Sequence, residues 1–509
     1  MVRLTKKLSR ELWSKLPWKK FRRNLFRLQH RLYKAIRAGN PGKARKIQKL
    51  ILKSTSAKML AIRQITQLNK GKKTAGIDGK KSLDFEQRLS VFFSLNNLKY
   101  WTPKKLRRIS IPKKNGKTRI LSVPTIKDRI WQCLIKYALE PAHEATFSGD
   151  SYGFRPGRSA HDAQKRIFNL MRKASRGKDP TAHMRKRIIE LDIKKCFDRI
   201  SHKAIMDRVK APKNIKDAIF KSLKIGVFPE FPEQGTPQGG IFSPLLANIA
   251  LDGIEEVHTC IRYADDMLFF LKEKDNAEKV LGKIKNFLAE RGMEISEEKT
   301  KITLPTDGVN FLGWRFSVKK NGKFLCTPSE ENYVAFRKKV KAIVLNSNIG
   351  AVEKVKLLKP IIRGWKNYHQ YCDMSSSRDR LWFLNESTYK RFMKEKNMNS
   401  ERATELVRKA FCTGETSYSI NGFVNVQGIR SPYDGDIAYW SERNSKLYFG
   451  LTVDLLKKQD HKCGVCGSKF YNDEDIHLHH IDGNHDNWDK KNLTVIHNSC
   501  HQYIHMAES

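Results

Sequence analysis

The stretch IRYADDMLFF, residues 261–270, places two adjacent carboxylates inside a run of large apolar residues. The apolar residues on either side predict buried strands, so Asp265 and Asp266 mark a break between them. Burying two neighbouring carboxylates without a cationic partner is costly. Two interpretations follow, an Asx-type hairpin turn exposed to solvent or a site for a divalent metal ion.

A third carboxylate follows another apolar stretch upstream. The segment RIIELDIKKCFDRI, residues 187–200, predicts a strand that ends at Asp192. One single and one paired strand-end acid can together hold two Mg²⁺ ions about 3.5–4 Å apart, as nucleotidyl transfer requires. Mg²⁺ takes few protein carboxylates and completes its shell with substrate phosphates, and the Ile193 carbonyl would add one oxygen. Asp192, Asp265 and Asp266 therefore predict a two-metal phosphoryl-transfer site.

Positive charge dominates the composition of the 509-residue chain. There are 99 Lys and Arg against 52 Asp and Glu, a net charge of +47, and residues 1–70 hold 21 basic residues and one acid, Glu11. Such an excess indicates a nucleic-acid partner. A membrane surface is the alternative polyanion, but it usually needs only one basic amphipathic element. Because no apolar run approaches a span of about 18 residues and no secretory signal opens the sequence, we expect a soluble, intracellular protein.

The spacing of apolar residues predicts the order of the elements. A basic helical hairpin is expected over 18–67, broken at GNPG (39–42), and a basic helical region over 345–410. Between them, residues 70–325 alternate short strands and helices, which predicts a mixed α/β domain with its carboxylates at strand ends. The expected strands are RRISIPK, KTRILSV, RIIELDI, CIRYADDMLFFL, KITLP and NFLGWRF, and the expected helices are 126–140, 159–175, 202–210, 244–255 and 276–291.

The cysteines indicate reduced thiols and one metal site. Six of the nine are scattered singly, and Cys463, Cys466 and Cys500 fall in the last 50 residues. Cys463 and Cys466 have the spacing of a zinc knuckle, and His497 and Cys500 repeat that spacing downstream. The sequence therefore predicts a structural Cys₃His zinc site that lets a small module fold. His497 stands where a cysteine is usual, so another histidine remains an alternative fourth ligand.

Several blocks resemble, in the same order, those of bacterial group II intron-encoded proteins, which are reverse transcriptase–maturases with a C-terminal endonuclease. The resemblance covers most of the chain. The blocks are TAGIDG (74–79), RRISIPKKNGKTRILSVPTIKDRIWQ (107–132), SYGFRPGRSAHDA (151–163), LDIKKCFDRI (191–200), GTPQGGIFSPLLANIALD (235–252), YADD (263–266), ISEEKTKI (295–302), FLGWRF (311–316) and LLKPIIRGWKNYHQY (357–371).

The resemblance implies a multidomain α+β protein. Its parts would be a right-hand polymerase with fingers and palm, an α-helical maturase or thumb region, and a small zinc-containing ββα-metal (HNH) domain. The expected boundaries are a basic helical extension over 1–70, fingers and palm over 71–340, the thumb and a DNA-binding region over 341–450, and the endonuclease over 451–509.

The resemblance also implies roles for single residues around the carboxylates. Phe197 would exclude a ribose 2′-hydroxyl, although a lone aromatic is more often a core residue. Gln238, between Pro237 and two glycines that allow close backbone approach, would lie against the nascent base pair. Arg119 would bind the triphosphate together with its neighbours Lys113, Lys114 and Lys117, for which solvated hairpin charges are the alternative. Lys299 would contact the primer strand or cap a helix.

The terminal module also resembles the HNH nuclease pattern, through HHID, Asn492 and His501. Hydrolysis of a phosphodiester needs a base for water and a cation on the leaving oxygen. In that pattern His479 and His501 hold the cation, His480 is the base and Asn492 fixes the loop that carries the base. The alternative is an inert zinc ribbon that only grips DNA.

These expectations add up to a retroelement protein of the bacterial cytoplasm, associated with the nucleoid. It would bind its group II intron RNA, assist splicing, nick target DNA and copy the RNA from deoxynucleotides by target-primed reverse transcription. Its metals would be two Mg²⁺, one nuclease cation and one Zn²⁺. The competing classes are a non-enzymatic splicing factor and a polymerase of another lineage, such as a retron or CRISPR-linked enzyme. Intact Asp192, Asp265 and Asp266 argue against the first, and the thumb followed by the HNH pattern argues against the second.

Overall fold

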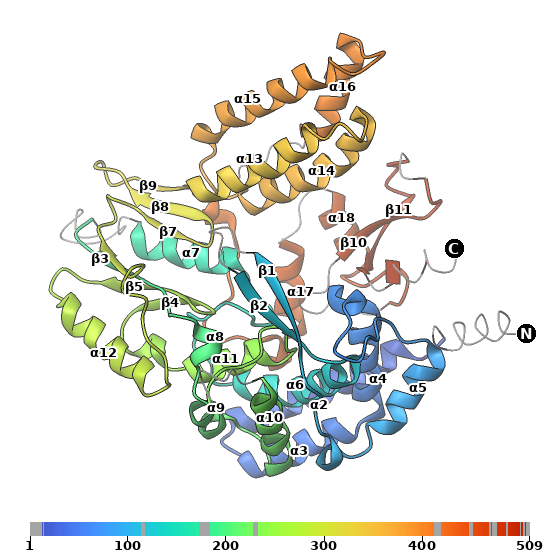
Figure 1. Ribbon diagram of the computed structural model, residues 1–509, viewed down its shortest axis with the longest axis vertical. Coiled ribbons are helices and arrows are strands. Elements are labelled where there is room, and N and C mark those ends of the chain that lie inside the picture. The colour runs from blue at the N-terminus through green and yellow to red at the C-terminus, as the bar shows by residue number, and fades with distance from the viewer. Residues whose placement is uncertain are drawn as a thin grey trace, which may run out of the picture.

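The computed structural model describes residues 13, 15–112, 118–172, 184–226, 233–411, 419–446, 451–467, 470, 476–484, 487–498, 500–501 and 504. In Figure 1 the N-terminal helices lie beneath a central β-hairpin, four thumb helices lie above it, and the palm strands and the terminal module lie on opposite sides. No helix in the described part of the chain is both long enough and apolar enough to span a bilayer.

A basic helical layer forms the N-terminal part. The expected hairpin break at GNPG is confirmed, because α2 ends at Arg37 and α3 begins at Pro41. Gly39 takes a positive φ of 65°, and the Asn40 side chain accepts a hydrogen bond from the Lys43 backbone at 2.9 Å. The elements are α2 (Trp18–Arg37), α3 (Pro41–Lys53), α4 (Thr55–Arg63), η1 (Gln64–Leu68), η2 (Lys70–Lys73), α5 (Phe85–Ser94) and η3 (Leu98–Tyr100).

The palm is built on a four-stranded sheet in the order β4-β5-β3-β6, with antiparallel neighbours. The strands are β3 (Arg187–Leu191), β4 (Cys260–Tyr263), β5 (Asp266–Leu271) and β6 (Lys301–Thr303). Alternate residues of β3 and β5 enter two different hydrophobic clusters, with Ile189 and Phe269 on one face and Ile188 and Phe270 on the other. Because both faces are buried, the strands read as continuous apolar runs.

Two smaller sheets flank the palm. The hairpin of β1 (Arg107–Pro112) and β2 (Thr118–Val123) is mostly exposed. A three-stranded antiparallel sheet of β7 (Val309–Phe311), β8 (Trp314–Val318) and β9 (Phe324–Pro328) leads towards the thumb. The expected strand NFLGWRF is split between β7 and β8, because Leu312 and Gly313 form a turn in which both residues have positive φ.

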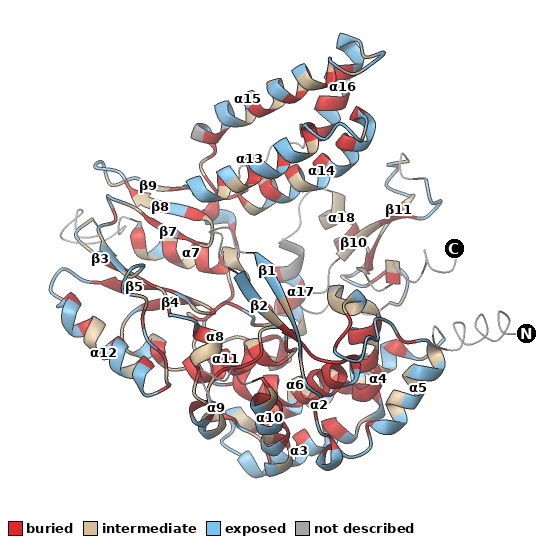
Figure 2. Cartoon of the chain, viewed as in Figure 1, coloured by how far each residue is buried: buried red, intermediate tan, exposed pale blue. Residues whose placement is uncertain are grey.

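Helices cover one face of the palm sheet and join it to the N-terminal layer. One hydrophobic cluster runs from α2, α3 and α4 through α6 to the palm strands, so residues 18–65 share a core with the palm. Figure 2 shows this continuous buried region in α6 and α11. The helices on this face are α6 (Ile126–Glu144), α8 (Cys196–Arg199), α9 (His202–Arg208), α10 (Lys213–Ile225), α11 (Ser243–Leu251), η4 (Ile254–Glu256) and α12 (Ala277–Ala289). Helix α7 (Ala160–Met171) packs in the cluster on the other face.

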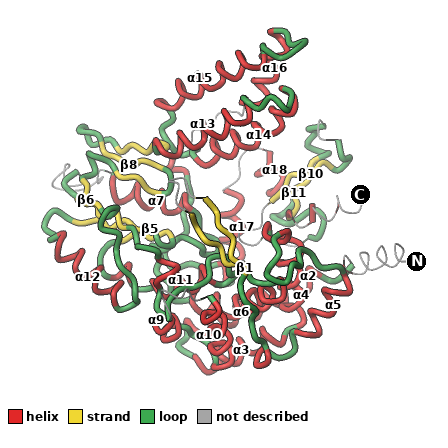
Figure 3. The backbone as a smooth tube through the Cα atoms, viewed as in Figure 1, coloured by secondary structure: helices red, strands yellow, loops and turns green. Residues whose placement is uncertain are grey.

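The helical region expected over 345–410 is part of a four-helix thumb that begins earlier, at Glu330, and is drawn as long red coils in Figure 3. It comprises α13 (Glu330–Val344), α14 (Ala351–Tyr368), α15 (Ser375–Phe392) and α16 (Ser400–Phe411). On α14, Ile362 and Trp365 are buried while Arg363 is exposed. The amphipathic pattern of that helix therefore buries its apolar side and leaves Arg363 on the outer side.

After the thumb, the chain returns to the palm and then forms the terminal module. The returning segment contains η5 (Ile420–Gly422), η6 (Pro432–Asp434) and α17 (Ile437–Lys446). Its Arg443 donates to both carboxylate oxygens of Asp162 on α7, at 2.8 and 2.9 Å. The module consists of α18 (Leu451–Lys458) and the antiparallel pair β10 (Ile476–His480) and β11 (Leu493–His497), around a small core of its own.

Most expected elements appear, with shifted ends. The expected helix 126–140 continues to Glu144, and the expected helix 244–255 ends at Leu251. The second ends early because Gly253 has a φ of 96°, which a helix does not tolerate. The sequence reading missed α5, α10 and β9, and the domain boundaries stay predictions.

Candidate active site

The three carboxylates converge where two palm strands end. Strand β3 ends at Leu191, which lies opposite Met267 of β5, so Asp192 follows directly beside Asp266 at the same end of the sheet. The strands β4 and β5 close with the pair Tyr263 and Asp266, which leaves Ala264 and Asp265 as a two-residue turn. The acid pair is thus both a tight hairpin turn and part of an acidic cluster.

Burial and the neighbouring carboxylates both raise the pKa values of the acid pair. Burial raises the pKa of Asp265, the Asp192 carboxylate raises it further, and Arg119 and Lys299 oppose the shift. Desolvation, followed by the charges of Asp265 and Asp192, raises the pKa of Asp266 to about 6. The Asp266 side chain remains open to solvent by its accessible surface, so a cation can reach it. The cluster disfavours its own negative charge, which is the setting in which a divalent cation is bound.

The donor set fits Mg²⁺, a hard cation that takes oxygen ligands. A single bridge joins Ile193 to Ile295. Its hydrogen bonds come from flanking residues, since the Lys194 N–H donates to the Glu294 carbonyl and the Ser296 N–H donates to the Asp192 carbonyl. The bridge therefore does not use the Ile193 carbonyl, whose predicted role as a further oxygen ligand stays open.

The structure places Lys299 beside the carboxylates, and its expected contact with the primer strand stays a prediction. Its ammonium group forms an ion pair with the Asp192 carboxylate. It follows the bridge between Ile193 and Ile295 and is more than half exposed, so it faces the carboxylates from solvent.

The loop of Gln238 is tied to the segment of Phe197. The Thr236 N–H donates to the Phe197 carbonyl at 2.7 Å, and the Gln238 side-chain amide donates to Asp198 at 3.3 Å. On its other side the loop meets β2, where the Ser122 N–H donates to the Gln238 carbonyl at 2.7 Å. A Cβ at Gly239 would lie 2.8 Å from the Ser122 carbonyl, which explains the glycine there.

Phe197 is half-buried and packs against the main hydrophobic cluster. The core interpretation and the steric interpretation therefore both retain support, because the side chain packs against the cluster yet remains partly accessible to solvent. Arg119 lies on the exposed hairpin, opposite Ile111, and its charge acts on Asp265. Its neighbours Lys113, Lys114 and Lys117 lie outside the described residues.

The charged residues of SYGFRPGRSAHDA have structural partners that the sequence reading missed. Arg155 makes two hydrogen bonds to Glu144, at 2.8 and 2.9 Å, with both side chains almost fully buried. Arg158 donates to the Gly149 and Gly428 carbonyls, each at 2.7 Å, and Asp162 pairs with Arg443. These contacts bind the loop to α6 and to the returning segment. No periodic signal in the sequence indicates them, because the partners lie outside the loop's own secondary structure, and Gly428 and Arg443 are more than 250 residues away.

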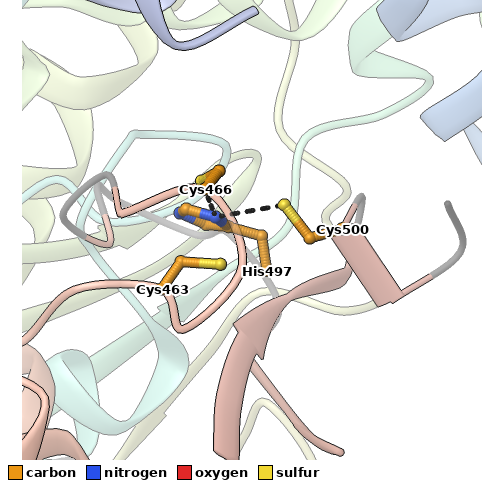
Figure 4. A group of neighbouring side chains, drawn as sticks. All are labelled: Cys463, Cys466, His497 and Cys500. Carbon is orange, nitrogen blue, oxygen red and sulfur yellow. Dashed lines mark hydrogen bonds between the residues drawn. The ribbon is translucent and has the colours of Figure 1, made fainter. Parts of the chain in front are cut away.

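Four side chains of the terminal module form a compact cluster, shown in Figure 4. Cys463, Cys466, His497 and Cys500 offer ligand atoms that all lie within 4.8 Å of one another. The His497 Nδ1 lies 3.3 Å from the Cys466 Sγ and 3.8 Å from the Cys500 Sγ. A zinc tetrahedron with bonds of about 2.0–2.3 Å has edges of about 3.3–3.8 Å, so these residues fit the expected ion. No described cysteine forms a disulfide, and Cys412 lies outside the described residues.

The remaining histidines separate into two groups. The rings of His477 and His479 lie 5.1 and 5.4 Å from that of His501, while the His480 ring packs edge-on against Trp488 at 5.2 Å and is nearly buried. Asn492 holds the loop after β10, since its side chain donates to Asp482 at 2.8 Å and accepts from the Asp482 N–H at 3.0 Å. The structure therefore brings together the two expected cation ligands and places Asn492 on the expected loop.

Comparison with known families agrees with this architecture. The model of reverse transcriptase (RNA-dependent DNA polymerase) matches residues 111–316, the N-terminal domain of reverse transcriptase matches 13–95, and the group II intron maturase-specific domain matches 334–409. None of these three models extends into the terminal module.

Related proteins extend the match over most of the chain. Maturase-like protein 1 of Euglena gracilis is 35% identical over 455 residues, covering 89% of this chain and 96% of that protein. The group II intron-encoded protein LtrA of Lactococcus lactis subsp. cremoris is 28% identical over 386 residues, covering 58% of this chain and 62% of that protein. A solved telomerase structure from Candida albicans has a TM-score of 0.28 and 13% identity over 62% of this chain and 64% of that one, below the level that indicates a shared fold.

The palm carboxylates, the fingers hairpin and the helical thumb define a polymerase of the reverse-transcriptase type. The chain belongs to the family of group II intron maturases and reverse transcriptases. It is therefore a maturase with an RNA-directed DNA polymerase domain, which assists intron splicing and mobility and has intron RNA and deoxynucleotides as its ligands. The expected bacterial source, cytoplasmic location and nucleoid association stay predictions.

Proposed function

We propose that this chain copies RNA into DNA with Asp192, Asp265 and Asp266 as the ligands of two Mg²⁺ ions. The observation that supports it most is the convergence of these carboxylates at the ends of β3 and β5. Bound Mg²⁺ would activate the primer 3′-hydroxyl and stabilise the leaving pyrophosphate. The raised pKa values of Asp265 and Asp266 support the proposal, because the acids gain most from a cation where their own charges repel one another.

The surrounding residues would position the substrates. Arg119, at the exposed end of the fingers hairpin, would hold the triphosphate by charge-assisted hydrogen bonds. Gln238 would meet the new base pair from a loop already fixed to β2. Phe197 would place its ring against the 2′ position of the sugar. Lys299 would keep its ion pair with the Asp192 carboxylate, or contact the primer strand.

A polymerase-inactive maturase is the competing function, and the intact carboxylates argue against it. The test is extension of a DNA primer on an RNA template, with deoxynucleotides and Mg²⁺. The double variant Asp265→Asn/Asp266→Asn should lose at least about a thousandfold in rate, since each lost electrostatic contact to the reacting groups costs about 10²–10³-fold. It should still bind intron RNA and promote splicing.

The control variant is Asp207→Asn, which removes an exposed acid on α9 that pairs with Lys203. Its extension rate should match that of the unmodified protein. Extension by the double variant at a near-normal rate would refute the assignment of the metal ligands.

We propose further that the terminal module is an HNH nuclease held together by Zn²⁺ at Cys463, Cys466, His497 and Cys500. The support is the size of that cluster and the loop fixed by Asn492. His479 and His501 would hold one divalent cation on the DNA phosphate. His480 would take a proton from the attacking water, after DNA binding opens its contact with Trp488. A DNA-gripping zinc ribbon is the alternative.

Together the two sites would allow target-primed synthesis. The nuclease would nick one DNA strand, and the 3′-hydroxyl at the nick would enter the palm as a primer for copying intron RNA. The net charge of +47 supports simultaneous binding of RNA and target DNA. A supercoiled plasmid with the insertion site, incubated with the protein–RNA complex, should yield first a nick and then cDNA covalently joined to it. cDNA that stays free of the plasmid would refute this order.

A further inference from the structure

A fully buried arginine lies directly behind the catalytic turn. Arg262 is on β4, two residues before Ala264, and its side chain is completely buried. Its Nε donates to Glu255 at 2.6 Å, and its Nη1 donates to Asn248 at 2.8 Å and to the Ala264 carbonyl at 3.4 Å. That carbonyl belongs to the peptide that leads into Asp265. The guanidinium therefore joins η4 and α11 to the turn that carries the acids.

The backbone of the turn is held from a second direction. The Tyr152 N–H donates to the Arg262 carbonyl at 2.9 Å, and the Arg262 N–H donates to the Asp150 carbonyl at 3.0 Å. The Asn248 side chain donates to the Gly153 carbonyl at 2.9 Å. A Cβ at Gly153 would lie 2.4 Å from the Ala264 nitrogen, so only glycine permits this close approach.

The turn itself has a conformation that needs such support. Ala264 has a φ of 60°, in the left-handed region that non-glycine residues rarely adopt. A conformation of this kind is energetically unfavourable and persists only where the surroundings enforce it. The side chain that follows is Asp265, so a relaxed turn would move a carboxylate relative to Asp192.

We infer that Arg262 is a positioning residue for the polymerase reaction, which with Asn248 and Gly153 holds the Ala264–Asp265 turn in the geometry that binds metal. This inference rests on the proposed polymerase function. The planar guanidinium is needed because it contacts three separate groups at once, which a lysine ammonium on a flexible stem does not reproduce. A purely structural ion pair with Glu255 would need only the charge.

Two variants disturb the turn in different ways. Arg262→Lys keeps a cation for Glu255, so no buried carboxylate is left without a charge partner, but it loses the fork to Asn248 and Ala264. Gly153→Ala leaves the ion pair intact and pushes against the Ala264 backbone. Arg443→Lys is the matched control, because Arg443 is similarly buried against a carboxylate but pairs with Asp162 on α7 instead of the turn.

The first measurement is Mn²⁺ binding in a ternary complex, followed by electron paramagnetic resonance. The complex contains RNA template, a dideoxy-terminated primer and the next deoxynucleotide, so binding is read without turnover. The second is the Mg²⁺ concentration at half-maximal extension. Arg262→Lys and Gly153→Ala should each weaken Mn²⁺ binding and raise the Mg²⁺ requirement roughly 10-fold or more, the effect of losing a group that orients metal ligands. Their RNA binding and circular dichroism spectra should stay normal, and Arg443→Lys should match the unmodified protein in both metal measurements.

The outcomes separate the two hypotheses. If the unmodified protein extends primers and Asp265→Asn abolishes extension, yet folded Arg262→Lys and Gly153→Ala show normal metal dependence, the positioning role is refuted and the polymerase proposal stands. If the unmodified protein neither extends primers nor binds Mn²⁺ through Asp265, the proposed function fails and this inference fails with it. An equal metal defect in Arg443→Lys would show general destabilisation and would also refute the specific role.

Discussion

The palm turn and the terminal module hold their chemical groups by opposite means. In the palm, strand pairing places the three carboxylates inside a large shared core. The distant segment at Asp150 also holds the strand that carries Arg262, next to the turn. The four zinc-ligand candidates lie within 38 residues of one another and surround a core of only a few side chains. A large core fixes a site before its metal binds, whereas a small core relies on the metal for its fold.

Metal removal should give the largest difference between the two sites. A chelator that takes Mg²⁺ should abolish primer extension and leave the palm folded. A zinc-selective chelator should leave extension from a supplied primer intact and expose the chain beyond about residue 455 to protease. Extension assays and limited proteolysis on the same samples provide the check. A palm that became protease-sensitive on loss of Mg²⁺ would contradict the difference drawn here.

Two single substitutions should separate fold from chemistry inside the module. Cys463→Ser should lose zinc, become protease-sensitive and lose DNA nicking, because a ligand of the fold is gone. His480→Ala should keep one zinc and its protease resistance, yet lose nicking about a hundredfold or more, as expected for a general base. Zinc content by mass spectrometry and plasmid nicking give both readouts. If the His480→Ala variant kept its zinc and nicked DNA normally, the nuclease assignment would be wrong and the module would be a zinc ribbon that only binds DNA.

A smaller effect should appear at Phe197, which is half-buried and packs against the main hydrophobic cluster. Phe197→Ala should lower the preference for deoxynucleotides over ribonucleotides roughly tenfold, since a single steric contact is worth about 1–3 kcal/mol. Single-turnover incorporation of both nucleotides measures the ratio. Phe220→Ala, on the partly exposed side of α10, is the control and should leave the ratio unchanged. The same ratio in both variants would assign Phe197 to the core alone.

The carboxylate cluster should also give a characteristic pH dependence. Protons compete with Mg²⁺ for Asp266, whose pKa is about 6, so extension at low Mg²⁺ should fall severalfold as pH drops from 7 to 6. More Mg²⁺ should shift this acid limb to lower pH. In the folded protein Asp266 keeps its proton up to about pH 6, whereas in the unfolded chain it loses the proton near its ordinary pKa of 3.8. The metal-free fold should therefore lose stability as the pH rises from 3.8 to about 6. If the acid limb stayed at the same pH at every Mg²⁺ concentration, competition between protons and Mg²⁺ at Asp266 would be excluded as its cause.

The smallest expected change concerns the basic face of α2, which we expect to contact nucleic acid. Arg23, Arg27 and Arg31 are exposed at helical spacing, and α2 contains no acid. Replacing all three with alanine should reduce the slope of log K against log salt by about 2–3, the share of three phosphate contacts. Lys274, Lys279 and Lys283, exposed on or beside α12, form the control triple. Equal slopes for the two triple variants would mean that α2 is not a specific contact surface.

The sequence by itself indicated which residues we propose for both sites. The carboxylates after RIIEL and within YADD, and the Cys-His spacings, indicated metal sites because few other arrangements justify such residues beside apolar strands. Helix and strand positions followed from apolar spacing, which is a local property. The reading missed α10 and β9, and it left Lys299 between two roles, neither of which is the ion pair with Asp192.

Only the tertiary structure decided what holds the acids in place. Arg262, Asn248, Glu255 and Gly153 are ordinary residues in the sequence, and their contacts join positions up to about a hundred residues apart. The arginines of SYGFRPGRS were equally ambiguous, since a basic loop in a chain of net charge +47 suggests RNA, yet Arg155 and Arg158 are buried against protein. The physical reason is that charge and periodicity are properties of short stretches of sequence. The partner of a buried charge, in contrast, depends on which distant segments pack together.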